Sequence, residues 1–176
     1  MKFLEMPIEG AWAIQPEPAR DDRGYFARVF DVDAFIEHGL ATDVVQAGVS
    51  FNRHARTLRG LHFQVPPHEE NKLVRCSRGA VFDVVVDLRS ESPTYLQWHG
   101  DELVADEGRM LYVPTGCAHG FVTMVDESVV HYQIDAPYVP AAARGIRWDD
   151  PSIGIDWPVE PAVMSERDRS LPELEP

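Results

Sequence analysis

The sequence predicts an all-β protein, a sandwich or barrel with one or two short helices. Two observations predict it. Apolar residues fall in short β-branched or alternating runs, and glycine, proline and aspartate punctuate these runs at the spacing of antiparallel strands rather than of alternating strands and helices. The 176 residues fit one domain, 1–176, which is large enough to bury a core without cross-links or structural metal.

The expected strands are rich in valine, leucine, isoleucine and aromatic residues, which suit a pleated and half-buried surface. In chain order they are 27–30, 44–49, 58–64, 73–76, 81–88, 95–98, 110–113, 121–125 and 129–134. Turns are expected between them at 24, 48, 66–67, 78–79, 92–93, 100–101, 108, 114–116 and 126.

Two short helices complete the expected elements. The first covers 33–38, because Asp31 or Asp33 is available as an N-cap and Gly39 as a stop. The second covers 166–169 behind the cap Ser165. The proline-rich tail from 158 onward is expected to wrap the domain rather than join a sheet.

Charge and composition disfavour several kinds of partner. Sixteen lysines and arginines against 29 aspartates and glutamates give a formal net charge of −13, which repels nucleic acid and anionic membrane surfaces. Cys76 and Cys117 lack the CxxC spacing of zinc or redox sites, so a reducing, cytoplasmic location is expected. The first residues carry an acid and a proline where a signal peptide is apolar, and no run reaches membrane-spanning length.

His62 is followed by side chains with which an imidazole can carry out proton transfer. They supply a cation, a second imidazole, a phenol and carboxylates: Lys72, Asp83, His119, Tyr132 and Asp168. Polar groups on apolar strand faces need partners when they are buried, and mutual contact provides them. Any one of these residues, taken alone, could be a buried polar residue of the core whose hydrogen bonds are satisfied. The set together favours an enzyme site in a barrel-like cavity.

The segment 108–119 resembles the second signature of the cupin superfamily, a double-stranded β-helix (jelly roll) often built around a metal. Metal-binding cupins place two histidines and a glutamate in the first signature, where this chain has His62, Gln64 and Lys72. An ammonium repels a divalent cation, and glutamine is a poor substitute for imidazole. We therefore expect no metal and a site suited to an anion.

Further segments resemble the dTDP-4-dehydrorhamnose 3,5-epimerase family of that superfamily. They cover nearly the whole chain in order and include 59–64, 72–76, 79–87, 92–95, 114–121, 145–151 and 165–168. The resemblance implies a cupin-type jelly roll that epimerises C3 and/or C5 of a nucleoside-diphosphate 4-keto-6-deoxyhexose through an enolate, without a cofactor, in deoxysugar biosynthesis such as that of rhamnose. It also implies a homodimer that exchanges N-terminal strands.

The resemblance implies a role for each catalytic candidate. His62 is the base, Asp168 its orienting partner, Lys72 the stabiliser of the enolate and Tyr132 the acid. A base, an oxyanion stabiliser and an acid across the ring are what such a reaction needs. Asp83 is a rival partner for His62, because it lies on an apolar strand face. In that case Asp168 only caps the last helical turn.

Resemblance also nominates side chains for the nucleotide. They are Arg23, Arg59, Arg167 and His119 for the diphosphate, and Phe26, Tyr138 and Gln46 for the base or sugar. Both aromatic residues also have a purely structural interpretation, in which Phe26 is an ordinary core residue and Tyr138 anchors a loop. Strict alternation places Arg59 opposite His62, so either Gly60 allows a bulge, or Arg59 serves another part of the pocket or a neighbouring subunit.

The chain departs from the family pattern at three positions. Arg28 stands where many members have glutamate, Gly48 where asparagine is common and Ala143 where glutamate is usual. Arginine only donates hydrogen bonds and therefore cannot accept one from the N–H of thymine. This suggests that Arg28 belongs to a base site with an altered preference, with cytosine as one possibility.

Three alternatives to the epimerase are weighed. A 3,4-ketoisomerase of the same ketosugars shares the enolate chemistry and differs in where the proton and carbonyl finish. A non-catalytic sugar-nucleotide binding protein is disfavoured by the presence of His62 together with Tyr132. A metal-dependent oxygenase is disfavoured by Lys72.

Overall fold

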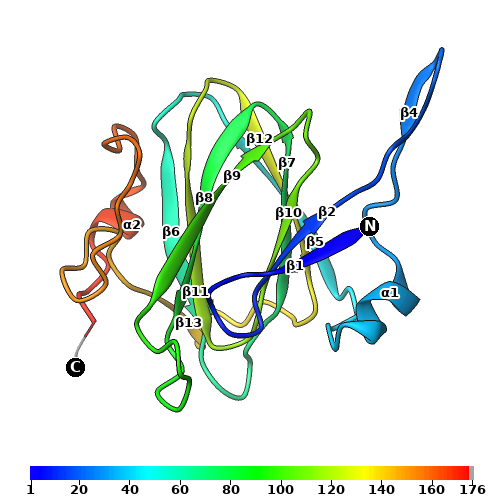
Figure 1. Ribbon diagram of the computed structural model, residues 1–176. Helices are drawn as coiled ribbons and strands as arrows, with labels where there is room; N and C mark the ends of the chain where they lie inside the picture. Colours follow the sequence, from blue (N-terminus) through cyan, green and yellow to red (C-terminus); the bar gives the residue numbers. More distant parts are fainter. Residues whose placement is uncertain (175–176) are drawn as a thin grey trace.

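The computed structural model describes residues 1–174, which form two antiparallel β-sheets packed face to face with a short helix outside each (Figure 1). The six-stranded sheet runs, in spatial order, β1 (Lys2–Glu5), β2 (Trp12–Gln15), β10 (Met110–Val113), β7 (Lys72–Arg78), β12 (Ser128–Ile134) and β5 (Gln46–Asn52). The five-stranded sheet runs β13 (Ala143–Gly145), β6 (Leu58–Gln64), β11 (Cys117–Thr123), β8 (Ala80–Asp87) and β9 (Trp98–Val104). The expected all-β jelly roll is confirmed.

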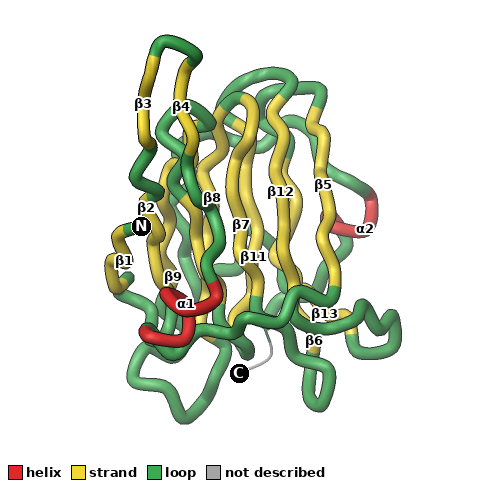
Figure 2. The backbone as a smooth tube through the Cα atoms, turned by 90° about the vertical axis from the view of Figure 1, so that its right-hand side faces the viewer, coloured by secondary structure: helices red, strands yellow, loops and turns green. Residues whose placement is uncertain are grey.

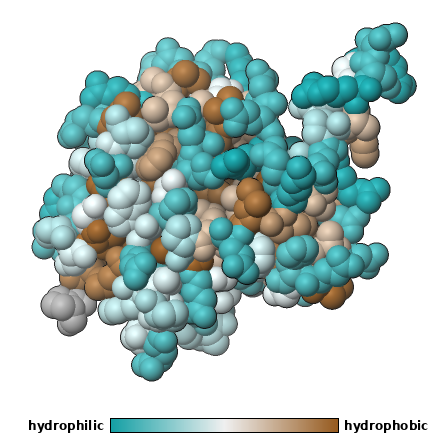
Figure 3. All heavy atoms as spheres, in the orientation of Figure 1, coloured by the Kyte–Doolittle hydropathy of each residue, from teal (hydrophilic) through white to brown (hydrophobic). Residues whose placement is uncertain are grey.

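The remaining elements are a hairpin and two helices. Strands β3 (Ala19–Asp21) and β4 (Gly24–Phe26) pair only with each other, and their hairpin projects from the body (Figures 1 and 3). Helix α1 (Val32–Glu37) lies outside the six-stranded sheet, which faces the viewer in Figure 2. Helix α2 (Glu166–Arg169) contacts β6 on the other side of the molecule.

Three apolar clusters pack between the sheets and against the outer face of each. The cluster between the sheets includes Val74, Val85, Leu111, Phe121 and Val130. A second cluster packs Phe35 of α1 against the outside of the six-stranded sheet. The third packs Ile146, Ile153 and neighbours from the C-terminal segment against the outside of the five-stranded sheet. Two-sided burial explains why β8 reads as an almost continuous apolar run.

The helices form where their caps are encoded. Asp31 accepts from the Ala34 amide at 3.2 Å and caps α1. Ser165 Oγ accepts from the Asp168 amide at 3.0 Å and caps α2. The C-terminal segment wraps the domain as expected, apart from one parallel bridge between Thr57 and Val163. Because this segment covers the five-stranded sheet, it brings α2 to the side of β6.

Several expected elements are wrong in detail. Residues 27–30 form no strand, and of 95–98 only residue 98 is in a strand, at the start of β9. Strands β1, β2, β3, β4 and β13 and the rest of β9 were not expected. Residues 100–101 are not a turn, because Gly100 lies inside β9, where a Cβ would come 2.2 Å from the ring of Phe82. Gly48 likewise lies inside β5, opposite Tyr132. At Gly100 a neighbouring side chain passes close, as is common for glycines inside strands, whereas a Cβ at Gly48 would meet nothing within 4 Å.

Candidate active site

One cavity of about 420 Å³ gathers most of the candidate residues. Its lining comes from both sheets and from α2: Ser50, Arg59, His62, Glu70, Lys72, His119, Phe121, Tyr132, Ile134, Ser165, Arg167 and Asp168. The volume lies within the range of small-molecule sites, about 300–1,000 Å³. All four candidate catalytic residues line it, although they are spread from 62 to 168 along the chain.

Asp168, rather than Asp83, is the carboxylate beside His62. His62 Nε2 and Asp168 Oδ1 are 2.8 Å apart. Burial acts to raise the pKa of Asp168, but the hydrogen bond and charge of His62, with the Gly60 amide and Ser165, outweigh it and hold that pKa below its usual range. An ionised Asp168 accepts a hydrogen bond from the Nε2–H of His62, so that Nδ1 carries the lone pair with which the imidazole can act as a base.

Asp83 belongs to a second imidazole–carboxylate pair. Its side chain is fully buried, and its two oxygens lie 2.8 and 3.0 Å from Nε2 of His119. His119 is opposite His62 across the β6–β11 ladder, and its ring centroid is 6.1 Å from that of Tyr132. The cavity thus holds two imidazoles, each oriented by its own carboxylate.

Tyr132 retains its proton and leaves its hydroxyl available. Burial raises the pKa of Tyr132 well above its ordinary value, and the charge of Asp83 adds to this effect. The hydroxyl forms no hydrogen bond with any residue of the described chain, 1–174. A protonated phenol that lines the same cavity as a paired imidazole is suited to be an acid.

A bulge at Gly60 turns Arg59 and His62 toward the same cavity. The β6–β11 register shifts between His119 and Phe121, and Gly60 has φ of +139°. Gly120 lies so close that a Cβ on Gly60 would be 2.6 Å from its Cα. Of the two explanations for Arg59, the bulge is the one observed. Asn52 Oδ1 then holds the guanidinium through Nε at 2.7 Å.

The remaining candidates for nucleotide binding are not all in this cavity. Arg167 lines it, and Gln46 donates to the Ala136 carbonyl at 2.6 Å. Arg23 and Phe26 lie on the projecting hairpin, where Phe26 is 72% exposed. Arg28 pairs with Asp31 at 2.7 Å, and Tyr138 is 54% exposed. Of these six residues, only Arg167 lines the cavity within one chain.

Sequence reasoning missed Glu70, which lines the cavity beside Lys72. Its Oε1 lies 3.0 Å from Lys72 Nζ. Glu70 falls in the loop before β7, where no strand alternation assigns a face. Its only sequence signal is proximity to Lys72.

Two further findings concern metals and membranes. Within residues 1–174, no three histidine, cysteine, aspartate or glutamate side chains are grouped so as to hold a metal ion. No helix of the same residues is long and apolar enough to cross a membrane.

Residues 5–176 match the family model of dTDP-4-dehydrorhamnose 3,5-epimerase. The chain belongs to this family. It is 45% identical to the dTDP-4-dehydrorhamnose 3,5-epimerase of Sinorhizobium fredii, over 99% of this chain and 90% of that protein. It is 41% identical to the dTDP-4-dehydrorhamnose 3-epimerase of Streptomyces niveus, over 96% of this chain and 82% of that protein.

Solved structures of the dTDP-4-dehydrorhamnose 3,5-epimerase family agree. The crystal structure of the Bacillus anthracis enzyme with TDP and PPi bound has a TM-score of 0.95 and 40% identity, over 98% of this chain and 99% of that chain. The family resemblance of the sequence motifs is therefore confirmed. The chain is an isomerase of the epimerase type rather than a binding module.

Proposed function

We propose that His62 and Tyr132 epimerise C3 and/or C5 of a nucleoside-diphosphate 4-keto-6-deoxyhexose, without a cofactor. One observation carries this assignment of roles. His62, paired with Asp168 at 2.8 Å, lines the same cavity as Tyr132, whose hydroxyl forms no hydrogen bond within residues 1–174. Membership of the epimerase family supports the ketosugar as substrate.

The proposed step moves one proton off carbon and returns another. His62 Nδ1 removes the proton from the carbon beside the C4 ketone, and the C–H electron pair becomes the C=C bond of an enolate. The carbonyl electrons move to oxygen, where an N–H of Lys72 stabilises the negative charge. Tyr132 then donates its proton to the opposite face of that carbon, and the ketone re-forms. Solvent restores both side chains.

The cavity gathers several cationic side chains beside Glu70 and Asp168, although the chain carries −13. Arg59, Arg167 and Lys72 line it together with His119. Guanidinium forks match phosphate oxygens in pairs. The diphosphate is therefore assigned to the side of the cavity that Arg59 and Arg167 form.

A homodimer would account for two of the candidates that lie outside the cavity, Arg23 and Phe26. The hairpin β3–β4 exposes Tyr25 (57%) and Phe26 (72%), and a hollow of about 570 Å³ lies at its root. Strand β5 is the last strand of the six-stranded sheet within residues 1–174, with Val49 and Phe51 exposed, and its Ser50 lines the cavity. An exposed apolar edge is a site for added strands. The hairpin of a second subunit, laid along β5, would bring Arg23 and Phe26 to the nucleotide.

The proposed location is the cytoplasm. Cys76 and Cys117 are both buried free thiols in the described part of the chain. Such thiols suit a reducing compartment.

Solvent exchange tests the proposed roles. A panel of 4-keto-6-deoxy sugar nucleotides is incubated with enzyme in deuterium oxide, and C3 and C5 are followed by NMR. Label at one or both carbons is expected, with at least about a hundredfold loss in His62→Ala, as general-base contributions require. A carbonyl that moves from C4 to C3 would instead indicate the 3,4-ketoisomerase. Absence of label in the wild type would remove the proposal.

The base preference has its own test. Arg28 donates to Asp31 and offers no acceptor for the N–H of thymine. We therefore infer a base site that differs from one built on glutamate. Calorimetric titration with dTDP, CDP, UDP and GDP measures the preference. A clear preference for dTDP would contradict this inference without affecting the epimerisation.

A further inference from the structure

Lys72 is a buried cation whose ammonium is held from two sides. Its Nζ lies 3.0 Å from Glu70 Oε1 and donates to the His62 carbonyl at 3.2 Å. The side chains of Lys72 and Glu70 are only 6% and 11% exposed. An ammonium has three N–H donors. With two directed at protein atoms, the third is left for the cavity that Lys72 lines.

Glu70 is in turn held by Gln64, which is 3% exposed. Gln64 Nε2 donates to Glu70 Oε2 at 2.9 Å, so each carboxylate oxygen has its own partner. The two hydrogens of this amide are shared with the His68 carbonyl at 2.9 Å and the Pro137 carbonyl at 3.1 Å, and its Oε1 accepts from the Val139 amide at 2.7 Å. Gln64 therefore forms hydrogen bonds with the backbone on both sides of Tyr138, at Pro137 and Val139.

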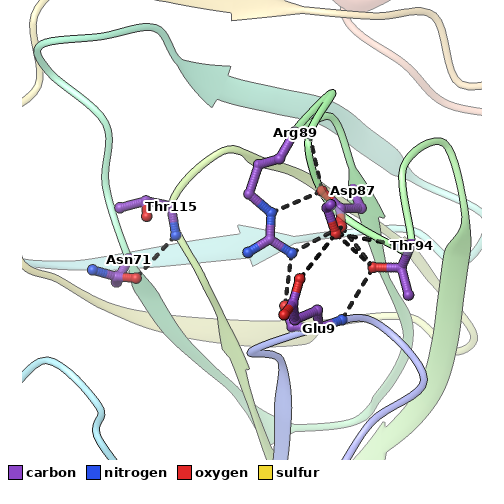
Figure 4. A network of polar contacts seen from close by, with 7 residues as sticks. Glu9, Asn71, Asp87, Arg89, Thr94 and Thr115 are labelled. Carbon is purple, nitrogen blue, oxygen red and sulfur yellow. Dashed lines mark hydrogen bonds and ion pairs between the residues drawn. The ribbon is translucent and has the colours of Figure 1, made fainter.

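The residue between Glu70 and Lys72 is also fixed. The amide of Asn71 donates to Asp135 Oδ1 at 2.7 Å, and its Nδ2 donates to Asp135 Oδ2 at 2.6 Å. Asn71 Oδ1 accepts from the Thr115 amide at 2.9 Å (Figure 4). The short segment 70–72 is thus anchored through its backbone and side chains, which favours a single position of the ammonium.

We propose that Glu70 is a positioning residue for Lys72, and that Gln64 links its place to the loop that carries Tyr138. This inference rests on the proposed function, in which Lys72 stabilises the enolate. Preorganised donors stabilise developing charge without reorganising during the reaction. The carboxylate also supplies the counter-charge that a buried ammonium needs.

The test compares three variants over a range of pH. Glu70→Gln keeps the shape and removes the charge. We expect kcat to fall about tenfold to a hundredfold, less than the loss of a whole oxyanion donor. The high-pH limb of the kcat profile is expected to move to lower pH, because a buried ammonium then lacks its counter-charge. Glu70→Asp keeps the charge but shortens the side chain by one methylene, which moves the carboxylate away from Lys72. We therefore expect kcat to fall while the high-pH limb of the profile stays in place.

Glu69→Gln is the matched control. Glu69 is the adjacent glutamate, partly buried, and its side chain forms no hydrogen bond within residues 1–174. The same removal of charge there should leave kcat and the pH profile unchanged. An equal effect in both variants would mean that net charge, rather than the contact with Lys72, is responsible.

The results separate this inference from the proposed function. A Glu70→Gln enzyme with wild-type kcat and an unmoved limb would overturn the positioning role, while wild-type label exchange would still support the epimerase. No exchange in the wild type would overturn both. If Glu70→Gln does not fold, wild-type kcat in Glu70→Asp overturns the role by itself.

The proposed link between Gln64 and the loop that carries Tyr138 is tested by a separate measurement. Gln64→Leu should lower kcat and also raise KM for the sugar nucleotide, because both Glu70 and the Tyr138 loop lose their partner. Glu70→Gln should change KM by less than about threefold, since it removes no ground-state contact with the nucleotide. An unchanged KM in Gln64→Leu would remove the link and leave the role of Glu70.

Discussion

Gly60→Ala is expected to damage stability and activity together. Gly60 has φ of +139°, and a Cβ there would lie 2.6 Å from Gly120 Cα and 3.2 Å from the His119 carbonyl oxygen. Both neighbours are backbone, so no side chain can rotate away and β6 must separate from β11. The backbone conformation costs about 1–3 kcal/mol, and overpacking costs about 1–3 kcal/mol more.

The free energy of unfolding should therefore fall by about 2–6 kcal/mol in total. For a chain of this size that lowers Tm by at least about 4 °C. Arg59 and His62 flank the bulge, and a displacement of about 1 Å at such a site costs roughly a hundredfold in rate. Urea denaturation gives the stability, and label exchange in deuterium oxide gives the rate.

Gly48→Ala is the control for stability. Gly48 also lies in a strand, but a Cβ there meets nothing within 4 Å. Its substitution should change the free energy of unfolding by less than about 1 kcal/mol. If Gly60→Ala is as stable and as active as Gly48→Ala, then the close approach of β6 and β11 does not orient Arg59 and His62, and the reasoning is refuted.

Three further predictions concern protonation. Asp168→Asn should fold normally and lose roughly a thousandfold or more in kcat, because an amide selects the wrong imidazole tautomer; a loss below tenfold in steady-state assays would argue against the pair with His62. Burial acts to raise the pKa of Asp87, but hydrogen bonds from Arg89, Ser92 and Thr94 outweigh it and lower that pKa to about 2 (Figure 4). The resulting stability is present above the unfolded value near ~3.9 and is lost as pH falls toward 2. Tm measured from pH 5 to 2 should therefore drop less steeply in Asp87→Asn, and identical slopes would contradict this. Burial raises the pKa of Cys117 to about 12, so the native protein should resist iodoacetamide at about pH 8 and react only when unfolded; rapid native labelling of Cys117, read by mass spectrometry, would show the opposite.

Strand periodicity predicted the central strands well and the peripheral ones poorly. Strands 58–64, 110–113 and 129–134 have apolar sequences that report burial directly, and all three are observed. The strand β9 was missed because Gly100 reads as a turn. Its role is to make room for the ring of Phe82, which belongs to a neighbouring strand. Such a role depends on a contact and leaves no local pattern.

The site shows the same division. The types of residue needed for proton transfer were evident from the chain, and His62, Lys72, Tyr132 and Asp168 do share one cavity. Glu70 was not found, because it lies in a loop where no periodicity assigns a face. Arg59 was placed on the wrong face by strict alternation, which the bulge at Gly60 breaks.

By itself, the sequence determined the all-β class, the two capped helices and the family, because alternation, caps and motifs are local properties. Only the tertiary structure decided which carboxylate meets His62. Asp168 is 106 residues away and reaches it because the C-terminal segment wraps over β6, while Asp83 turns to His119. A contact between distant residues depends on the path of the whole chain, and no local pattern encodes that path.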